Sequence, residues 1–508
     1  MLAAVTSYGL MGIGGFGVRV ETDIAAGLPS YDTVGLPDAA VRESKERVRA
    51  AIKNSGFTFP AARITVNLAP ADRRKEGAVY DLPIALSILA ASGQLGPAPA
   101  LDGVFLGELS LDGGLRPVSG VLPMLIDAAL HGLTRSFVPP DNAQEAACLP
   151  DAEVYAVPSL AALAAHIRGA ERLCPVERTA WETEPPAFDT DFSEIKGQQG
   201  AKRAAEIAVA GGHNLLLIGT PGSGKTMLAR ALPSIMPELS FAEALEITKI
   251  HSVVGATKGR GILRARPFRA PHHGASAAAL VGGGARALPG EISLAHYGVL
   301  FLDELPEFGR EVLEALRQPL EDGFITVSRA ANTATYPAEF VLVAAMNPCP
   351  CGNYGSRVNA CRCASSQVQR YRGKISGPLL DRIDMQVEMP EVGYAELSER
   401  SGGEPSSAVR ARVNRARERQ RARFSGDGIF MNAQMPTQLI KEYCAPDAES
   451  ERLLRRAFSE WRLSARAYQR ILKVARTIAD LEESEQILPR HYAEAIQYRS
   501  LDIGDRGF

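Results

Sequence analysis

Residues 219–226 read Gly-Thr-Pro-Gly-Ser-Gly-Lys-Thr, between an apolar run at 215–218 and a helix-forming stretch at 227–232. A glycine-rich loop that joins a strand to a helix is typical of a phosphate-binding loop, and a chance glycine-rich turn is the alternative. The glycines let backbone N–H groups face phosphate oxygens, while the lysine charge meets the β- and γ-phosphates and the threonine hydroxyl meets Mg²⁺. We therefore expect a nucleoside triphosphate, with Mg²⁺, to be bound by Gly219, Thr220, Pro221, Gly222, Ser223, Gly224, Lys225 and Thr226.

Two carboxylates follow a second apolar strand, as in a Walker B motif. Residues 298–302 contain no charge, and Asp303 and Glu304 come directly after them. Asp303 is expected to hold Mg²⁺ through water, and Glu304 to act as general base toward the attacking water. Asn347 ends a third apolar run, where its amide can orient the same water. Alternatively, Asp303 and Glu304 are solvated charges in a loop, and Asn347 only begins a turn that contains proline.

The length of 508 residues predicts two to four domains. Residues 1–170 mix short β-branched runs with apolar helical stretches, and residues 171–191 contain three prolines and predict an extended linker. Residues 192–395 alternate apolar strands with helices, which predicts an α/β core with a parallel sheet covered on both faces. A polar break at 401–408 precedes helical sequence, so we expect residues 396–508 to form a helical domain.

Composition and charge exclude several classes of protein. The formal net charge is −2, so any contact with nucleic acid needs a local basic surface. The N-terminal segment lacks the basic region of a signal peptide, and the apolar part of 82–101 is too short to cross a bilayer. Seven cysteines without a secretory signal indicate a reducing compartment. We expect a soluble cytoplasmic protein with no membrane contact.

Four of these cysteines form a C-x-C-x₉-C-x-C pattern, namely Cys349, Cys351, Cys361 and Cys363. Four thiolates satisfy tetrahedral Zn²⁺ and can stabilise a loop too polar to fold alone. The spacing within each pair is tighter than the usual C-x₂-C, and reduced thiols in a surface loop are the alternative. The pattern favours a structural zinc site in the loop 349–363. A catalytic zinc is not expected, because no spare ligand position or nearby base is suggested.

Four further segments carry a family resemblance that covers essentially the whole chain. They are Pro-Phe-Arg-Ala-Pro-His-His (267–273), Pro-Gly-Glu-Ile-Ser-Leu-Ala-His (289–296), Asn-Pro-Cys-Pro-Cys-Gly (347–352) and Ser-Gly-Pro-Leu-Leu-Asp-Arg-Ile-Asp (376–384). Together they resemble the bacterial magnesium-chelatase-like AAA+ proteins known as YifB or ComM. The resemblance implies an AAA+ P-loop core with a C-terminal helical lid, and ATP and Mg²⁺ as ligands. It also implies a homo-hexameric DNA helicase that drives branch migration of recombination intermediates in natural transformation.

The same resemblance implies roles for two arginines. Arg382 would be the arginine finger that reaches the γ-phosphate bound to a neighbouring subunit. Arg466, in Ser-Ala-Arg-Ala (464–467), would be the sensor-2 arginine of the lid. An arginine beside the γ-phosphate stabilises the charge that spreads over its oxygens. Without the resemblance, Arg382 would be interpreted as an ion-pair partner of Asp381 or Asp384.

The first domain resembles the proteolytic domain of Lon through residues 106–118 and 138–142. A Lon protease needs a nucleophilic serine and a lysine whose pKa is depressed by burial. The expected serine region, 77–83, contains no serine, and the expected lysine region, 120–124, contains no lysine. Ser87 and Ser119 lack an evident base. We therefore expect an α+β domain without the Ser/Lys dyad and without protease activity.

Basic residues between the two nucleotide motifs are candidates for DNA contact. Glycine-rich cationic loops at this point of an AAA+ core commonly face the pore of the ring, where they can contact phosphates without reading bases. The alternative is that some of these side chains pair with acidic neighbours or face a subunit interface. The candidates are Lys258, Arg260, Arg264, Arg266 and Arg269, with Arg329 near the turn of a hairpin predicted over 324–336.

Two more polar segments allow alternative interpretations. His272 and His273 are expected to point apart, which argues against a metal pair and leaves nucleic-acid contact or packing. Residues 410–423 hold seven arginines and one acid, Glu418. This run is either a DNA-binding helix or a solvated face compensated by acidic residues at 391–404.

Two functions fit these features. The first is a motor that couples ATP hydrolysis to movement on single-stranded or branched DNA. The second is a chelatase-like or MoxR-like ATPase that remodels a protein partner. The Lon-like domain and the cysteine loop favour the first, since chelatase motor subunits are expected to lack that domain. A non-enzymatic scaffold is a further alternative.

Overall fold

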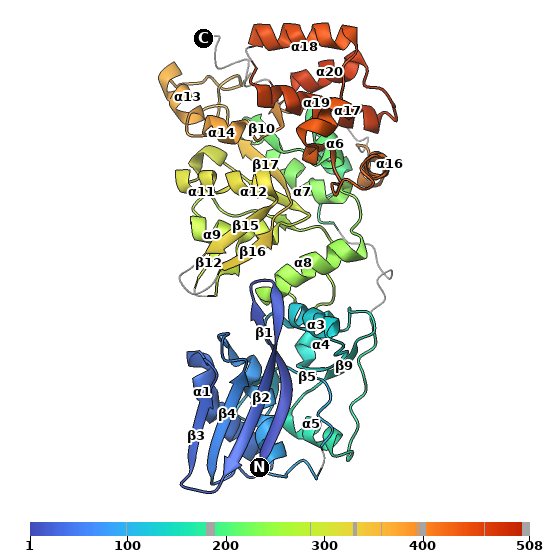
Figure 1. Cartoon of the computed structure of the whole chain (residues 1–508). Helices are drawn as coiled ribbons and strands as arrows, with labels where there is room; N and C mark the ends of the chain where they lie inside the picture. Colours follow the sequence, from blue (N-terminus) through green and yellow to red (C-terminus); the bar gives the residue numbers. More distant parts are fainter. Residues whose placement is uncertain are drawn as a thin grey trace.

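In a computed structural model of the chain, three units follow one another, and the first unit lies at the opposite end of the molecule from helices α18 (Ala448–Trp461) and α20 (Pro489–Gln497) (Figure 1). The structure describes residues 1–97, 99–178, 188–284, 286–328, 333–356, 358–393, 396, 403–461 and 463–499. Within these residues, no helix combines the length and the apolar character needed to cross a membrane.

Within the described residues, the first unit packs three sheets and five α-helices around one hydrophobic core. One sheet has the strand order β1-β2-β4-β3, the second has the order β5-β8-β9, and the third is the antiparallel pair of β6 and β7. The apolar part of 82–101 lies in helix α2, whose side chains are all buried. The elements are β1 (Leu2–Met11), β2 (Gly14–Ala25), β3 (Ser30–Val34), α1 (Ala39–Asn54), β4 (Arg63–Ala69), η1 (Ala78–Tyr80), α2 (Asp81–Ala91), β5 (Val104–Phe105), β6 (Glu108–Leu109), β7 (Leu115–Arg116), α3 (Val121–Leu130), β8 (Arg135–Val138), α4 (Pro140–Ala146), β9 (Glu153–Ala156) and α5 (Leu160–Ile167).

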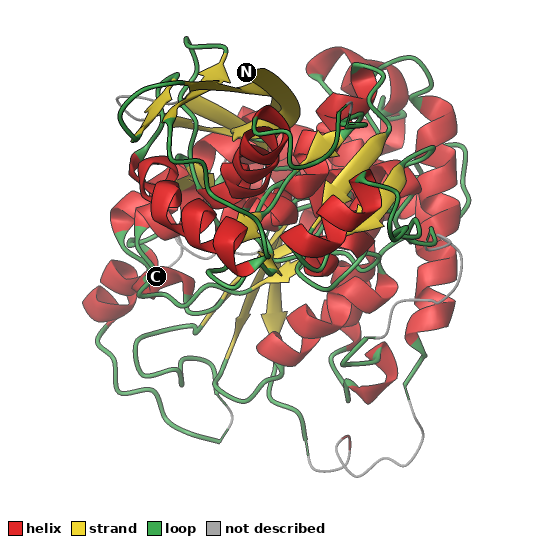
Figure 2. Ribbon diagram, turned by 90° about the horizontal axis from the view of Figure 1, so that it is seen from below, coloured by secondary structure: helices red, strands yellow, loops and turns green. Residues whose placement is uncertain are grey.

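The second unit is built on a five-stranded parallel sheet with the order β11-β14-β17-β10-β18. Alternate residues of β10 point to opposite faces, so that Leu215 and Leu217 enter one hydrophobic core and Leu216 and Ile218 another. Helices lie on both sides of the central strands (Figure 2). The structure therefore confirms the predicted parallel sheet covered on both faces.

The described elements of this unit include every strand predicted from the sequence and four strands that were not predicted. They are η2 (Phe192–Glu194), α6 (Gln199–Gly211), β10 (Leu215–Gly219), α7 (Lys225–Ile235), α8 (Phe241–Val253), β11 (Phe268–Arg269), α9 (Ala277–Val281), β12 (Gly282–Gly283), β13 (Leu288–Pro289), α10 (Glu291–Leu294), β14 (Val299–Leu302), η3 (Leu305–Glu307), α11 (Arg310–Ala315), α12 (Arg317–Asp322), β15 (Phe324–Ser328), β16 (Thr333–Pro337), β17 (Val341–Met346), α13 (Ser365–Arg372), α14 (Gly377–Leu380) and β18 (Met385–Met389).

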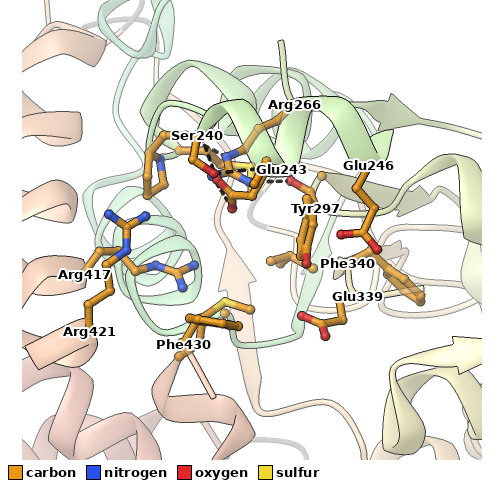
Figure 3. Close-up of a pocket in the computed structure, with 17 residues that line it drawn as sticks. Ser240, Glu243, Glu246, Arg266, Tyr297, Glu339, Phe340, Arg417, Arg421 and Phe430 are labelled. Carbon is orange, nitrogen blue, oxygen red and sulfur yellow. Dashed lines mark hydrogen bonds and ion pairs between the residues drawn. The ribbon is translucent and has the colours of Figure 1, made fainter. Parts of the chain in front are cut away.

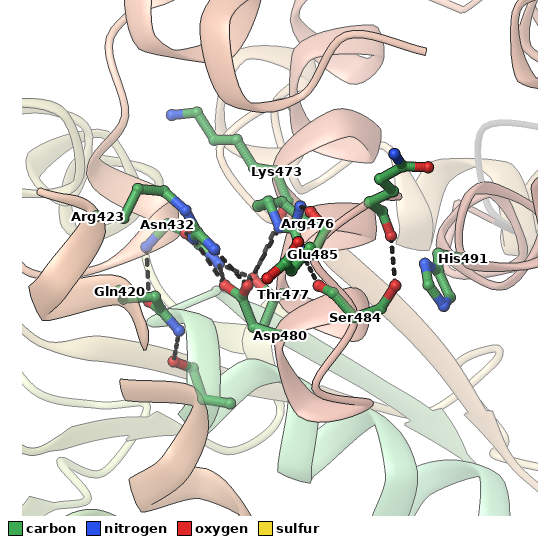
Figure 4. A network of polar contacts seen from close by, with 12 residues as sticks. Gln420, Arg423, Asn432, Lys473, Arg476, Thr477, Asp480, Ser484, Glu485 and His491 are labelled. Carbon is green, nitrogen blue, oxygen red and sulfur yellow. Dashed lines mark hydrogen bonds and ion pairs between the residues drawn. The ribbon is translucent and has the colours of Figure 1, made fainter. Parts of the chain in front are cut away.

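The third unit is the helical lid, with α16 (Ser406–Arg423), η4 (Asn432–Gln434), α17 (Thr437–Tyr443), α18 (Ala448–Trp461), α19 (Ala465–Leu481) and α20 (Pro489–Gln497). A buried polar network joins its helices (Figure 4). Asp480 of α19 accepts hydrogen bonds from Arg423 Nη1 at 2.9 Å, Asn432 Nδ2 at 2.8 Å and Arg476 Nε at 3.2 Å. One carboxylate therefore fixes α16, η4 and α19 together.

The first unit contacts the second through α3 and α4. Helix α3 lies against α8, and Gly120 N–H donates to Ser252 O at 2.8 Å. Thr257 Oγ1 donates to Glu145 Oε2 at 2.6 Å across the same junction. The beginning of the predicted linker is bound to the first unit, because Val176 N–H donates to Val154 O at 2.8 Å. Residues 179–187 of that linker lie outside the described part of the chain.

Candidate nucleotide site

The phosphate-binding loop runs from the end of β10 to the beginning of α7. Gly222 and Gly224 adopt φ angles of +81° and +91°, in the left-handed region that glycine populates without strain. Gly219 is required for a different reason, since a Cβ atom there would lie 2.7 Å from Met389 O of the adjacent strand β18. The glycines thus set the path of the loop and its approach to the sheet.

Lys225 is buried at the N-terminus of α7, where its ammonium group donates to the loop itself. Its Nζ lies 2.7 Å from Gly219 O, 2.9 Å from Thr220 O and 3.3 Å from Asn347 Oδ1. Burial lowers the pKa of Lys225, and the nearby carboxylates of Asp303 and Glu304 oppose that shift. The ammonium group is held at the mouth of the loop, where phosphate oxygens can replace its carbonyl partners.

Three strand ends bring the remaining predicted residues to the same edge of the sheet. Strands β10, β14 and β17 are parallel, so the residues that follow them lie side by side. Thr226 Oγ1 donates to Asp303 Oδ2 at 2.9 Å, which links the loop to the Walker B aspartate. Asn347 reaches the same place from the end of β17 and accepts from the lysine. The structure thus brings Lys225, Thr226, Asp303, Glu304 and Asn347 together.

The residues present fit ATP with Mg²⁺. Thr220 Oγ1 and Ser223 Oγ are buried without a hydrogen-bond partner in the described residues, as expected for groups placed to meet a ligand. Thr226 Oγ1 and Asp303 Oδ2 lie 2.9 Å apart, so the hydroxyl expected to meet Mg²⁺ is next to the carboxylate expected to hold the ion through water. The phosphate cradle and the residues that would hold Mg²⁺ are therefore already in place.

Arg382 lies at the opposite edge of the sheet from the phosphate loop of its own chain. Its carbonyl accepts from Asn214 Nδ2 at 3.0 Å, and Asn214 immediately precedes β10. The five residues of β10 separate this point from the loop by roughly 16 Å. The guanidinium group is buried and pairs with Glu321 of α12, not with Asp381 or Asp384.

Arg466 lies beside Arg382. Its Nη2 is 3.9 Å from Glu321 Oε1, and the next turn of α19 is bound to the segment before β18 because Arg470 Nε donates to Asp381 O at 2.7 Å. Both arginines implied by the family resemblance therefore share one carboxylate on the edge away from their own nucleotide loop. Glu321 carries no sequence signal and was not predicted.

The four cysteines of the loop 349–363 converge. Their sulfur atoms all lie within 4.8 Å of one another, with 3.4 Å between Cys349 and Cys351 and 3.7 Å between Cys349 and Cys361. Four thiolates around a tetrahedral Zn²⁺ at about 2.3 Å are about 3.8 Å apart, so the donor set fits that ion. The loop also touches the nucleotide site, because a Cβ on Gly352 would lie 2.7 Å from Pro221 Cδ.

Two of the basic residues predicted to contact DNA have structural partners instead. Arg269 makes a double hydrogen bond to Glu291, with Nε 2.6 Å from Oε2 and Nη2 2.7 Å from Oε1. Arg266 donates to Pro237 O, Tyr297 O and Glu243. These contacts favour the alternative interpretation of these basic residues, namely that they pair with acidic neighbours.

The other basic candidates lie elsewhere. Lys258 and Arg260 are exposed, but they lie beside the junction with the first unit, where Gly259 N–H donates to Asp141 O at 2.8 Å. Arg264 is half-buried. The predicted hairpin is present as the antiparallel pair β15–β16. Arg329, at its turn, lies outside the described residues.

Arg266 also lines a cavity of about 370 Å³ between the core and the lid (Figure 3). Arg417 of α16 faces this cavity and donates to Val209 O at 2.9 Å, and burial lowers the pKa of Arg417 to about 9. In the same helix, Arg412 pairs with Glu206 and Glu404. The arginine run of 410–423 therefore has partners in the core and in the acidic segment before it, which favours the interpretation of a compensated face.

The first unit contains no Ser/Lys dyad within the described residues. Ser87 is buried in α2, 2.6 Å from Thr22 Oγ1, and it also donates to Ile84 O at 2.8 Å. Ser119 lies at the junction, next to Gly255. The region where a serine is expected instead contains Asp81, which pairs with Arg47. These contacts are structural, and the lack of protease activity stays a prediction from the sequence.

Three segments of the chain match families named after magnesium chelatase. Residues 191–397 match the family described as magnesium chelatase, subunit ChlI, and residues 403–499 match the corresponding C-terminal family. Residues 20–142 match the family described as subunit ChlI of Mg-chelatase. The fold and the site are those of a magnesium-chelatase-like AAA+ ATPase.

Full-length relatives define the family more closely. A protein named YifB from Salmonella typhimurium is 45% identical over 503 residues, which is 99% of this chain and 97% of that protein. Competence protein ComM from Haemophilus influenzae is 45% identical over 505 residues, 98% of each chain. The magnesium-chelatase 67 kDa subunit of Chlorobaculum parvum is 29% identical over 163 residues, 31% of this chain and 23% of its own. The chain belongs to the YifB/ComM family of magnesium-chelatase-like AAA+ proteins.

The match at residues 20–142 bears on the first unit. Its description refers to a chelatase subunit, so the presence of this unit does not by itself separate a DNA motor from a chelatase-like ATPase. The similarity to Lon stays a prediction from the sequence.

Proposed function

We propose that the chain is a subunit of a cytoplasmic hexameric ring that hydrolyses ATP to move on single-stranded or branched DNA. The observation that carries this proposal is the separation of the nucleotide residues from the two arginines across one sheet. The task of branch migration during natural transformation is supported by the family, one member of which is named competence protein ComM.

Within one subunit, each nucleotide residue has a defined role in hydrolysis. Glu304 accepts a proton from the attacking water as the water oxygen bonds to the γ-phosphorus and the bond to the β-phosphate oxygen breaks. Asn347 orients that water, and Lys225 neutralises charge on the departing phosphate. Mg²⁺, held by Thr226 and Asp303, supplies further positive charge when bound.

The two arginines complete the site only between subunits. Arg382 and Arg466 are separated from their own loop by the length of β10, so in a ring they would face the γ-phosphate of the neighbouring chain. On ring assembly, the two guanidinium groups would leave the carboxylate of Glu321 and bind the γ-phosphate of the neighbouring subunit. Hydrolysis would then depend on an assembled ring.

Mixing subunits tests this shared site. Lys225→Ala and Arg382→Ala should each abolish hydrolysis. An equimolar mixture should regain part of it, because some interfaces then pair an intact loop with an intact arginine. No recovery in rings that are shown to contain both variants would mean that the arginine does not act across the interface.

Zinc is proposed as a structural ion in the loop 349–363, held by Cys349, Cys351, Cys361 and Cys363. DNA contact is proposed for Lys258, Arg260, Arg264 and Arg329, through phosphates and not through bases. Arg266 and Arg269 are left out because of their ion pairs. A removal of exposed positive charge should weaken DNA binding and reduce its salt dependence.

A chelatase-like or MoxR-like ATPase that remodels a protein partner is the second candidate, and the three chelatase-named matches favour it. The two candidates differ in what stimulates hydrolysis. The DNA motor predicts a rise in ATPase rate with single-stranded or forked DNA. Normal basal turnover that no DNA stimulates would reject the DNA motor in favour of the protein-remodelling ATPase.

A further inference from the structure

The two adjacent histidines before α9 lie against the Walker B motif. His273 Nδ1 is 3.2 Å from Glu304 Oε2, so the ring N–H can donate to the carboxylate of the proposed general base. The rings of His272 and His273 are not splayed apart as expected, because their centroids are only 4.1 Å apart. His272 has a different role, since its Nδ1 accepts from Gly274 N–H at 3.1 Å.

The backbone of Glu304 restricts where its carboxylate can go. Glu304 has a φ of +52°, and its N–H donates to Asp303 Oδ1 at 3.0 Å. A left-handed conformation is costly for a residue with a side chain, and it is retained where the surrounding structure enforces it. With the backbone fixed, the partner of the carboxylate decides its direction, and that partner is His273.

This pairing is weak enough to be reversible. The His273 side chain is 38% exposed and the Glu304 side chain 51% exposed, so water competes for the contact. Phe308 limits the movement of the imidazole on another side, with ring centroids 6.5 Å apart in an edge-on arrangement. When one oxygen of the Glu304 carboxylate accepts a hydrogen bond from this imidazole, the carboxylate is less available to take a proton from water.

The histidine belongs to a segment that reaches the β15–β16 hairpin. The chain continues from His273 into α9 and the short pair β12–β13, and β12 contacts β15. Ala275 and Ala277 pack into the same core as the buried side chains of that hairpin. A displacement of the hairpin can therefore move the segment that carries His273.

We propose that His273 is a positioning residue that restrains Glu304 in the absence of DNA and releases it when DNA displaces the hairpin. The inference rests on the proposed function, because it needs both Glu304 as general base and DNA at the ring. It assigns to His273 a role in coupling hydrolysis to DNA.

The test compares ATPase rates of His273→Ala, His273→Asn and the parent chain, with and without single-stranded DNA. Loss of this part-exposed hydrogen bond is expected to raise the DNA-free kcat of His273→Ala about two- to fivefold. The KM for ATP should not change, because no phosphate or magnesium ligand is altered. His273→Asn keeps an amide near the place of Nδ1 and should restore the low DNA-free rate.

Two controls separate this inference from the proposed function. Glu304→Gln should abolish hydrolysis, and a parental rate for that variant would reject the proposed hydrolytic site itself. His131→Ala removes an exposed histidine of the first unit and should leave the rates unchanged. If Glu304→Gln is inactive but His273→Ala has an unchanged or lower DNA-free kcat, the restraint is wrong while the hydrolytic site stands. The same conclusion follows if His273→Asn behaves as His273→Ala does.

Discussion

Replacing Asp480 by alanine should strongly destabilise the lid. This carboxylate is fully buried, and it faces Arg423 and Arg476, whose side chains are 14% and 4% exposed. Asn432 also donates to it. The substitution would leave two largely buried guanidinium groups without a counter-charge, and water has little access to replace it (Figure 4).

The size of the effect follows from this burial. Removal of one partner of a buried ion pair costs about 3–5 kcal/mol in free energy of unfolding. For a unit of about 100 residues, such as the lid, each kcal/mol lowers the Tm by about 4–8 °C, so we expect a decrease of at least about 12 °C in Asp480→Ala. Scanning calorimetry of the full chain measures this shift directly.

Asp427→Ala is the matched control, since this aspartate belongs to the same lid and is exposed. Its free energy of unfolding should stay within about 0.5 kcal/mol of the parent value. A loss below about 1 kcal/mol in Asp480→Ala would contradict this expectation, because it would mean that the network lies in a solvated environment, where such pairs contribute little.

Three other perturbations have defined outcomes. Gly352→Ala should weaken the binding of a fluorescent ATP analogue about five- to thirtyfold, because its Cβ would press on Pro221 of the phosphate loop. Gly355→Ala is the control and should leave the binding unchanged, because Gly355 has the same φ of +79° but open space around it. Metal analysis should find zinc in the parent and in Cys174→Ser but not in Cys361→Ser, and zinc absent from the parent would contradict the site. Burial lowers the pKa of His213 to about 4 from 6.5, so the unfolded chain binds the proton first and stability is lost as pH falls between these values. Unfolding measured across this window should show a slope of about 1.4 kcal/mol per pH unit that His213→Asn removes.

The nucleotide site could be predicted because its chemistry is local in the sequence. Lys225 and Thr226 belong to one motif, and Asp303 and Asn347 each follow an apolar run. Parallel strands then require these residues to meet at one edge, whatever the detailed packing. The convergence of the four cysteines was equally predictable, since they lie within fifteen residues.

Contacts between distant segments could not be predicted in the same way. The pairing of Arg269 with Glu291 and of His273 with Glu304 depends on the path of the chain between β11 and β14. The sequence periodicity that predicts helices and strands does not predict this path. The glycines of strands β1 and β2 also obscure the strand pattern near the N-terminus. Gly9 is needed there because a Cβ would lie 2.5 Å from Phe16 Cζ, yet glycine weakens the sequence pattern of a strand.

ATP-driven branch migration on a synthetic four-way or three-stranded junction tests the proposed motor most directly. The parent chain is predicted to convert the junction to its products with ATP and Mg²⁺. The variant Glu304→Gln is predicted to bind ATP but to leave the junction unchanged. Conversion by Glu304→Gln at the parental rate would contradict the account. So would a parent chain that hydrolyses ATP normally and leaves every junction unchanged.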